Sequence, residues 1–117
     1  MNTQTSGRAG EDIAARHLEA KGYTILTRNY RVREGELDVV AAKDDAVVFA
    51  EVKWRRNDRF AAPGESVGAR KQARLRRAAA LWMAEYGERD ARFDVIEIVE
   101  GIDGHGPRIN HIEDAFY

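Results

Sequence analysis

Apolar residues near the start of the chain recur at helical spacing. Ile13, Ala14 and Leu18 fall on one face of a helix, and Gly22 follows them as a stop signal. The pattern predicts an amphipathic helix over residues 6–21. The five residues before it are expected to be a disordered or loosely held N-terminus.

A longer apolar stripe marks a second helix in the C-terminal half. The stripe consists of Leu75, Ala78, Ala79, Trp82 and Tyr86. Ser66 is a suitable N-cap, and Gly87 follows the last apolar position. We expect a helix over residues 66–86 whose stripe, Tyr86 included, belongs to the core.

Five runs have the composition or the alternation of β-strands. They cover residues 23–30, 36–42, 46–53, 92–99 and 108–112. The tripeptide Lys43-Asp44-Asp45 fits a hairpin turn between the second and third runs. The order αβββαβ, with a short fifth strand after it, predicts a mixed sheet in which the strand after the second helix is parallel to the strand before it. The chain is thus expected to form one α/β domain over residues 1–117, with helices flanking the sheet.

Composition sets the class of protein and limits its chemistry. The chain has 117 residues, of which 44% are hydrophobic and 33% charged, as in soluble globular domains. No window approaches the roughly 20 uninterrupted apolar residues of a membrane span, and the start has no signal-peptide pattern. We therefore expect a cytoplasmic protein with no membrane partner. Because the chain has no cysteine, disulfides and thiolate chemistry are excluded, and any reaction must use oxygen and nitrogen groups.

Positive charge is concentrated in one segment, although the whole chain carries a net charge of −1. Residues 53–77 contain nine basic and two acidic residues, a balance of +7. Such a block on an acidic background is typical of a nucleic-acid contact surface. Charge alone is equally compatible with a solvated helix face that pairs with acids elsewhere in the fold.

Charged residues interrupt both strands of the predicted hairpin. Asp38 lies within an apolar run, and Glu51 and Lys53 close the next one. A turn at residues 43–45 places Asp38 and Glu51 about equally far from the turn on neighbouring strands, and it places Glu51 and Lys53 on one face. We expect the two carboxylates to lie close together.

A divalent cation would relieve the repulsion between two such carboxylates, each of which disfavours ionisation of the other. Mg²⁺ or Mn²⁺ takes oxygen ligands, so Asp38, Glu51 and the backbone carbonyl of Val52 form a reasonable metal site together with a substrate phosphate oxygen. Lys53 would orient or deprotonate the attacking water, or neutralise charge on the phosphate. The alternative is a structural salt bridge between Lys53 and one carboxylate.

Each predicted helix also carries one charge at the head of its apolar stripe. Glu11 lies three residues before Ala14, and Lys71 lies four residues before Leu75, so both are expected to point inward. Taken singly, Glu11 is better explained as a first-turn acid on the helix dipole, and Lys71 as a snorkelling surface lysine. The presence of Asp38, Glu51 and Lys53 shifts the balance towards a shared site.

Aromatic and histidine side chains are weaker candidates. Trp54 and Phe60 lie in the basic segment and are candidates for stacking on unpaired bases. His17 lies on the apolar stripe of the first helix and is interpreted as a packed or rim histidine rather than a ligand. His105 and His111 are too far from any acidic cluster in the sequence to indicate a zinc site.

Five short motifs follow one another along the chain. They are Gly22-Tyr23, Arg28-Asn29-Tyr30-Arg31, Gly35-Glu36-Leu37-Asp38, Phe49-Ala50-Glu51-Val52-Lys53 and Arg92-Phe93-Asp94-Val95. Together they resemble the YraN family of small bacterial proteins, from about residue 7 to residue 101. That family is similar to archaeal Holliday-junction resolvases and to the restriction-endonuclease-like PD-(D/E)xK nucleases.

The resemblance implies a restriction-endonuclease-like αβββαβ core and metal-dependent phosphodiesterase chemistry. In this interpretation Asp38, Glu51 and Lys53 match the signature acid, acid and lysine. Glu11 matches the glutamate of the first helix and joins the metal ligands. Leu37 stands where the superfamily signature has proline, and this departure removes no ligand.

These observations favour a Mg²⁺- or Mn²⁺-dependent endonuclease that acts on branched or flapped DNA. The residues expected to bind DNA phosphates are Arg55, Arg56, Arg70, Lys71, Arg74 and Arg77. Because junction resolvases need two sites for paired cuts, the resemblance also implies a homodimer. The alternatives are a non-catalytic nucleic-acid-binding or partner-recruiting module on the same fold, and ion pairs of Lys53 that only hold the hairpin together.

Overall fold

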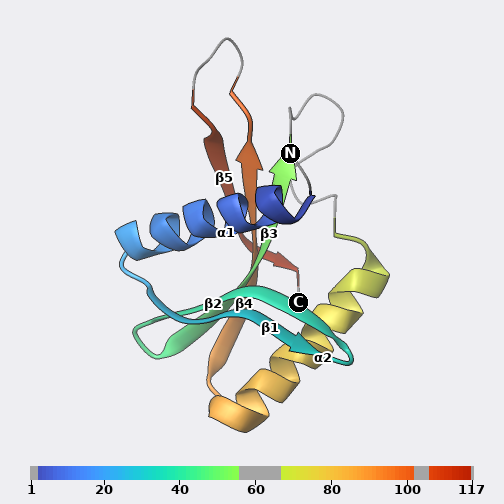
Figure 1. Ribbon diagram of the computed structural model, residues 1–117. Coiled ribbons are helices and arrows are strands. Elements are labelled where there is room, and N and C mark those ends of the chain that lie inside the picture. Colours follow the sequence, from blue (N-terminus) through green and yellow to red (C-terminus); the bar gives the residue numbers. More distant parts are fainter. Residues whose placement is uncertain (1–2, 56–66, 102–105, 117) are drawn as a thin grey trace.

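Two helices and five strands make up the computed structural model, which describes residues 3–55, 67–101 and 106–116 (Figure 1). The helices are α1 (Thr3–Ala20) and α2 (Ala69–Tyr86). The strands are β1 (Thr24–Val32), β2 (Gly35–Lys43), β3 (Ala46–Arg55), β4 (Asp90–Val99) and β5 (Arg108–Phe116). The predicted order of elements is confirmed.

The strands form one mixed sheet in the order β1-β2-β3-β4-β5. Neighbours are antiparallel except β3 and β4, which are parallel and are joined through α2. The tight turn between β2 and β3 has Asp44 at a φ of 56°, a left-handed conformation that Asp tolerates better than most residues. The predicted hairpin and the predicted parallel pair are both confirmed.

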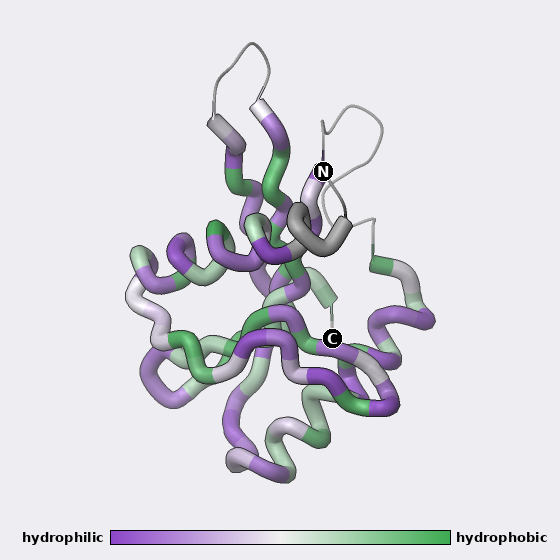
Figure 2. Tube along the Cα trace, in the orientation of Figure 1, coloured by the Kyte–Doolittle hydropathy of each residue, from purple (hydrophilic) through white to green (hydrophobic). Residues whose placement is uncertain are grey.

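Each face of the sheet is covered by one helix, because alternate strand residues point to opposite faces (Figure 1). One core joins α1 to the sheet and contains Ala14, Leu18, Val39, Val48 and Ile96. The other joins α2 to the opposite face and contains Phe49, Leu75, Ala78, Trp82 and Val95. Along α2, hydrophobic and hydrophilic stretches alternate, as an amphipathic helix requires (Figure 2).

Trp82 anchors α2 on the sheet. Its side chain is buried, its Nε1 donates a hydrogen bond to Thr27 Oγ1 at 2.9 Å, and its ring meets that of Phe49 edge-on at 5.7 Å. Tyr86 is 51% exposed, so the prediction that the whole stripe is buried is wrong at this position. The reason is that α2 ends at Tyr86, whose ring lies 5.0 Å from the ring of Trp82.

Three elements differ most from the ends that the sequence pattern predicts, and the other strands differ by one or two residues. Helix α1 begins at Thr3, three residues earlier than expected, and β5 continues four residues further, to Phe116. The N-cap of α2 is Gly68 rather than Ser66, which lies outside the described residues, and no side chain caps the helix. Neither described helix has the length and the apolar character needed to span a membrane.

Gly35 sets the distance between α2 and the start of β2. A β-carbon added at Gly35 would lie 3.1 Å from the backbone oxygen of Arg74, which cannot move aside without shifting the helix. The close approach brings the N-terminal half of α2 next to the strand that carries Asp38.

Gly35→Ala is therefore expected to lower the free energy of unfolding by about 1–3 kcal/mol, because the added methyl group overpacks the contact with α2. Gly106→Ala is the matched control, since an added β-carbon there meets nothing within 4 Å. Urea unfolding of both variants checks the expectation. Equal stability of the two variants would show that α2 is free to shift.

Candidate active site at the fork between two strands

The site lies where β2 and β3 stop pairing. Their ladder ends at the pair Val39 and Ala50, while β2 stays paired with β1 and β3 stays paired with β4. Beyond that point the carboxylate of Asp38 replaces the missing partner, since its Oδ2 accepts a hydrogen bond from Val52 N at 2.9 Å. This point of separation, called the fork from here on, places Asp38 directly against the backbone of β3.

Glu51 is the second acid of the fork, and it is almost fully buried. Its side chain is 6% exposed, and it lines the same cavity as Asp38. Lys71 Nζ lies 2.5 Å from Glu51 Oε1, and Lys53 Nζ lies 3.7 Å from the same oxygen. The structure therefore brings Asp38, Glu51, Lys53 and Lys71 together. Lys71 remains 44% exposed, but its ammonium group reaches this acid from α2.

The surroundings of Asp38 disfavour its negative charge. Burial raises the pKa of Asp38 to about 7, and the neighbouring charge of Glu51 adds to the effect. The hydrogen bond from Val52 N opposes this shift, and the charges of Glu11 and Glu36 add to it. Asp38 is thus a carboxyl group whose negative charge is poorly compensated within the protein.

The two lysines respond in opposite directions. Burial lowers the pKa of Lys53, and the neighbouring ammonium of Lys71 lowers it further. Burial also opposes the charge of Lys71, but the hydrogen bond and the charge of Glu51 outweigh that cost and raise the pKa of Lys71. Glu51 is therefore compensated chiefly by Lys71.

A cavity of about 530 Å³ opens beside the acids, between the β2–β3 fork and the first turns of α2. Asp38 and Glu51 lie on its sheet side, and Arg70, Lys71 and Arg74 lie on its helix side. Arg74 Nε donates to the backbone oxygen of Glu34 at 3.1 Å. The cavity thus has one acidic and one basic wall.

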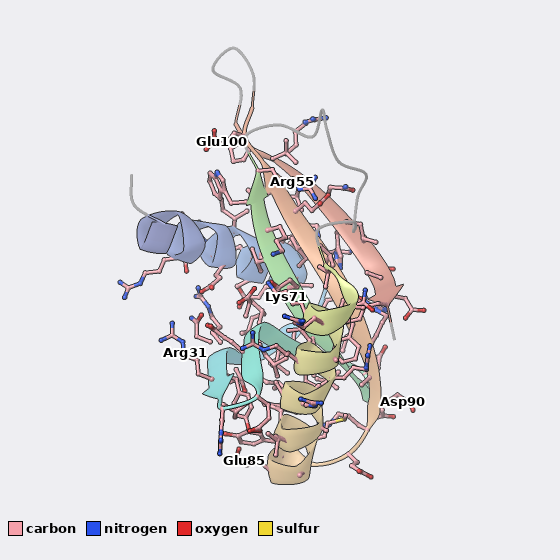
Figure 3. All side chains as sticks on the ribbon, turned by 90° about the vertical axis from the view of Figure 1, so that its right-hand side faces the viewer. Arg31, Arg55, Lys71, Glu85, Asp90 and Glu100 are labelled. Carbon is pink, nitrogen blue, oxygen red and sulfur yellow. The ribbon has the colours of Figure 1, made fainter. Side chains whose placement is uncertain are left out.

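The other basic residues predicted to bind DNA are placed differently. Arg77 is exposed on α2 and does not line the cavity. Arg55 lies further along β3 than Lys53 (Figure 3), its side chain is only 13% exposed, and its Nη2 lies 2.8 Å from the buried Glu97 Oε2. Arg56 lies outside the described residues.

Glu11 approaches the acids from α1. Its side chain is 13% exposed, and its Oε1 lies 3.9 Å from Arg28 Nη2. Its charge reaches Asp38, as the contribution to the pKa of Asp38 shows. Among residues 3–55, 67–101 and 106–116, no group of three or more His, Asp or Glu side chains is arranged to hold a metal ion, so Glu11 is not gathered with the two acids as it stands.

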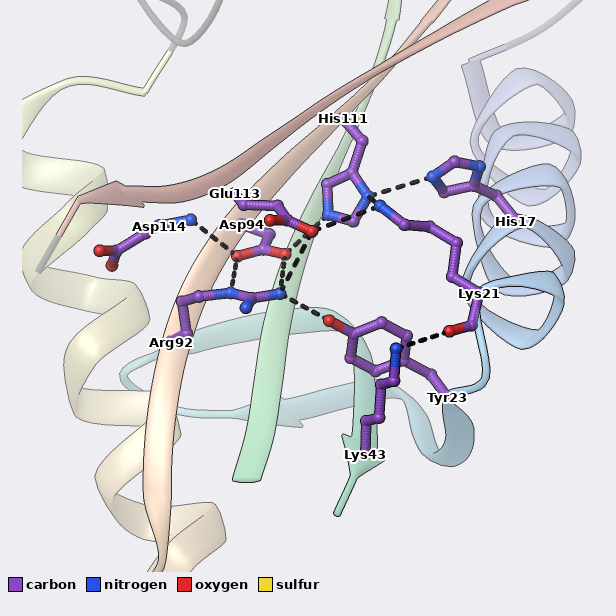
Figure 4. Close-up of polar contacts among 9 residues, drawn as sticks. All are labelled: His17, Lys21, Tyr23, Lys43, Arg92, Asp94, His111, Glu113 and Asp114. Carbon is purple, nitrogen blue, oxygen red and sulfur yellow. Dashed lines mark hydrogen bonds and ion pairs between the residues drawn. The ribbon is translucent and has the colours of Figure 1, made fainter. Parts of the chain in front are cut away.

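Sequence analysis did not identify a second polar cluster, which lies on the α1 face of the sheet (Figure 4). Asp94 is fully buried and accepts hydrogen bonds from Arg92, from His111 Nε2 at 2.7 Å and from Asp114 N. Burial opposes the charge of Asp94, but these donors outweigh it and lower the pKa of Asp94. The signal was present, because Asp94 and Glu97 interrupt the apolar run of β4.

His111 connects this cluster to α1. Its Nδ1 lies 3.0 Å from His17 Nε2 and 3.1 Å from Lys21 Nζ. His17 is half-buried, as expected for a packed histidine, and burial together with His111 lowers the pKa of His17. His111 is far from any acidic cluster in the sequence, but β5 lies beside β4 and brings it to the single acid Asp94. His105 lies outside the described residues.

Trp54 is engaged in packing. It belongs to the core under α1, and its Nε1 donates to Glu100 Oε1 at 2.6 Å. A β-carbon added at Gly10 of α1 would meet the Trp54 ring at 3.3 Å. The indole therefore closes the contact between α1 and β3. Phe60, the other aromatic candidate, lies outside the described residues.

Comparison with known proteins gives one consistent result. The sequence profile described as "Uncharacterised protein family UPF0102" matches residues 10–98. A UPF0102 protein of Frankia casuarinae is 49% identical over 113 residues, which cover 94% of each chain. A UPF0102 protein of Symbiobacterium thermophilum is 47% identical over 113 residues, which cover 95% of each chain.

The pKa of Asp38 makes the stability of the protein depend on pH. Because the folded protein holds this proton up to about pH 7, whereas the unfolded chain releases it near pH 4, the free energy of unfolding should fall as the pH rises through this window. Asp38→Asn removes the effect and is expected to be more stable than the wild type by about 2 kcal/mol at pH 8, with little difference below pH 4.

Urea unfolding without divalent cations, from pH 4 to pH 8, measures this difference. Asp45→Asn, in the exposed hairpin turn, is the control and should follow the wild-type curve. Curves of Asp38→Asn and wild type that stay parallel over the whole range would contradict the raised pKa.

Proposed function

The chain belongs to the UPF0102 (YraN) family, and from this premise we propose that it is a divalent-metal-dependent DNA endonuclease that hydrolyses phosphodiester bonds. One observation carries the proposal: the buried Glu51 and the half-buried Asp38, from adjoining strands, meet two lysines beside a cavity whose opposite wall is basic. Such a site offers donors for a hard cation next to donors for a phosphate.

The arrangement of elements supports the same proposal. An αβββαβ order around a mixed sheet, with the acids on β2 and β3 and a helix over each face, is compatible with the restriction-endonuclease-like core that the motifs resemble. The signature residues Asp38, Glu51 and Lys53 fall at the fork, where side chains reach the cavity or its edge.

The donor set fits a hard divalent cation such as Mg²⁺ or Mn²⁺. Asp38 and Glu51 offer carboxylate oxygens, and the raised pKa of Asp38 shows that its charge lacks a full counter-charge. The N–H and C=O of one strand residue point to the same side, so the Val52 carbonyl faces the side on which its N–H meets Asp38. When bound, the cation would act as a Lewis acid and lower the pKa of bound water.

The chain's own residues supply the remaining functions. Asp38 and Glu51 hold the cation, with Glu11 close enough to adjust the charge of Asp38. Lys53, on the same strand face as Glu51, orients or deprotonates the attacking water or neutralises charge that develops on the phosphate. Burial lowers the pKa of Lys53, so this ammonium group gives up its proton more readily than that of an ordinary lysine.

The basic wall binds the nucleic acid. Arg70 and Arg74 stand opposite the acids, and Arg77 extends the charge along α2. Contacts to phosphates position the substrate and carry little sequence information, so binding is selective for structure, such as branched or flapped DNA, rather than for sequence. Paired cuts of a junction would require two copies of the chain.

A non-catalytic role on the same fold is the second candidate, and one observation favours it. Glu51 already has two ammonium groups near its Oε1, an arrangement that holds a buried acid without any metal. In that case the protein binds nucleic acid through α2, the fork is purely structural, and divalent cations leave its stability unchanged.

Cleavage assays separate these candidates. Asp38→Asn and Glu51→Gln are each expected to reduce the cleavage rate roughly hundredfold or more, because each removes a charged ligand, while DNA affinity changes by less than about twofold. The substrates are single-stranded, nicked, flapped and four-way DNA in Mg²⁺ and in Mn²⁺.

Glu36→Gln is the matched control for these variants, because Glu36 lines the same cavity but pairs with Arg31 at the surface. It should cut like the parent. If Asp38→Asn and Glu51→Gln also cut like the parent, the active site is elsewhere. If no protein cuts and Mn²⁺ leaves the melting temperature unchanged, the non-catalytic role is the correct one.

The salt dependence of DNA binding tests the basic wall. If the protein neutralises about six phosphates, log affinity should fall with log salt with a slope near −5, and Arg70→Gln with Arg74→Gln should reduce the slope by about 2. Fluorescence anisotropy with a labelled duplex measures it. A wild-type slope near zero would show that the basic wall does not bind DNA phosphates.

A further inference from the structure

Glu51 is not an open ligand in the protein as it stands. Its side chain is 6% exposed, so water contributes little to its compensation. Its Oε1 is instead in contact with the ammonium group of Lys71 at 2.5 Å. A cation that binds this carboxylate competes with the ammonium group of Lys71.

We propose that the ammonium group of Lys71 pairs with Glu51 in the free protein and competes there with the divalent metal. When DNA binds, this ammonium group moves to a substrate phosphate. The inference rests on the proposed function, since it concerns the same acids and the same cavity. It assigns to Lys71 a positioning and regulatory role distinct from that of Lys53.

The two lysines differ in the freedom that such an exchange requires. Lys53 lies two residues from Glu51 on β3, its side chain is 27% exposed, and its ammonium is 3.7 Å from Oε1. Lys71 comes from the first turn of α2 (Figure 3), is 44% exposed, and its ammonium is 2.5 Å from Oε1. Its side chain reaches Glu51 across the cavity, so it can turn away without any movement of the strand.

The cavity provides the second position for the ammonium group. Lys71 shares the helix wall with Arg70 and Arg74, so a phosphate bound there would meet three cationic groups. A metal on Glu51 repels the ammonium, and the phosphate attracts it. Metal and DNA should therefore each strengthen the binding of the other, by the same factor in both directions.

The proposal predicts weak metal binding to the free protein and an increase when Lys71 is removed. Mn²⁺ titration by calorimetry, at fixed pH and salt, compares the wild type with Lys71→Met. The variant is expected to bind Mn²⁺ about tenfold more tightly, because a like charge next to the ligand oxygen is lost. Thermal unfolding of the metal-free variant checks that it is folded.

Arg74→Met is the matched control. It removes one positive charge from the same wall, but Arg74 holds the backbone oxygen of Glu34 rather than Glu51. Its Mn²⁺ affinity should rise by less than about threefold.

The same titration with a short DNA duplex tests the transfer of Lys71 to phosphate. It is done in the Lys53→Met background to prevent cleavage, with and without Lys71→Met. With DNA, the tenfold difference in Mn²⁺ affinity between the proteins with and without Lys71→Met should shrink to less than about threefold. The reason is that the phosphate has already drawn Lys71 away from Glu51.

Two results would overturn the proposal while leaving the proposed function intact. One is equal Mn²⁺ affinity of wild type and Lys71→Met without DNA, and the other is a gap that persists unchanged with DNA. If neither protein binds Mn²⁺ with or without DNA, the metal-dependent function itself fails, and this inference fails with it.

Discussion

The removal of two neighbouring carboxylates from water at the fork between β2 and β3, complete for Glu51 and partial for Asp38, is the constraint on which the site depends. Asp38 completes the hydrogen bonding of β3 where its neighbour strand has separated, and Glu51 lies beside it with almost no exposure to water. Such a pair is costly unless cations surround it. The lysines and the basic wall of the cavity therefore stabilise these acids, in addition to forming a surface that can bind a substrate.

The two faces of the sheet differ in role: the α1 face is closely packed, and the α2 face carries the candidate site. On the α1 face, Trp54, Gly10 and the Asp94–His111 cluster tie the helix to β3, β4 and β5 through packed and fully paired groups. On the α2 face, the helix covers only part of the strands, and its first turns stand over the acids. The close contact of α2 with Gly35 fixes this spacing, so the cavity has a defined width.

Burial also decides which charges are available to a substrate. Arg55 belongs to the basic segment, but its ion pair with Glu97 holds it against β4. Arg70, Arg74 and Arg77 remain at the surface of α2. An arginine charge thus contributes to stability at position 55, whereas on α2 it is available to contact a phosphate. The net charge of the chain does not distinguish these two roles.

The sequence by itself determined the elements, the hairpin, the parallel pair and the proximity of Asp38 and Glu51, because these follow from local periodicity and from a turn of known position. It also placed Lys71 on the inward face of its helix. Only the tertiary structure decided that Lys71 meets Glu51, that Glu11 lies beside Arg28, and that His111 lies on Asp94. These contacts join segments far apart in the chain, and their distances depend on how each helix and edge strand packs on the sheet, which periodicity does not specify.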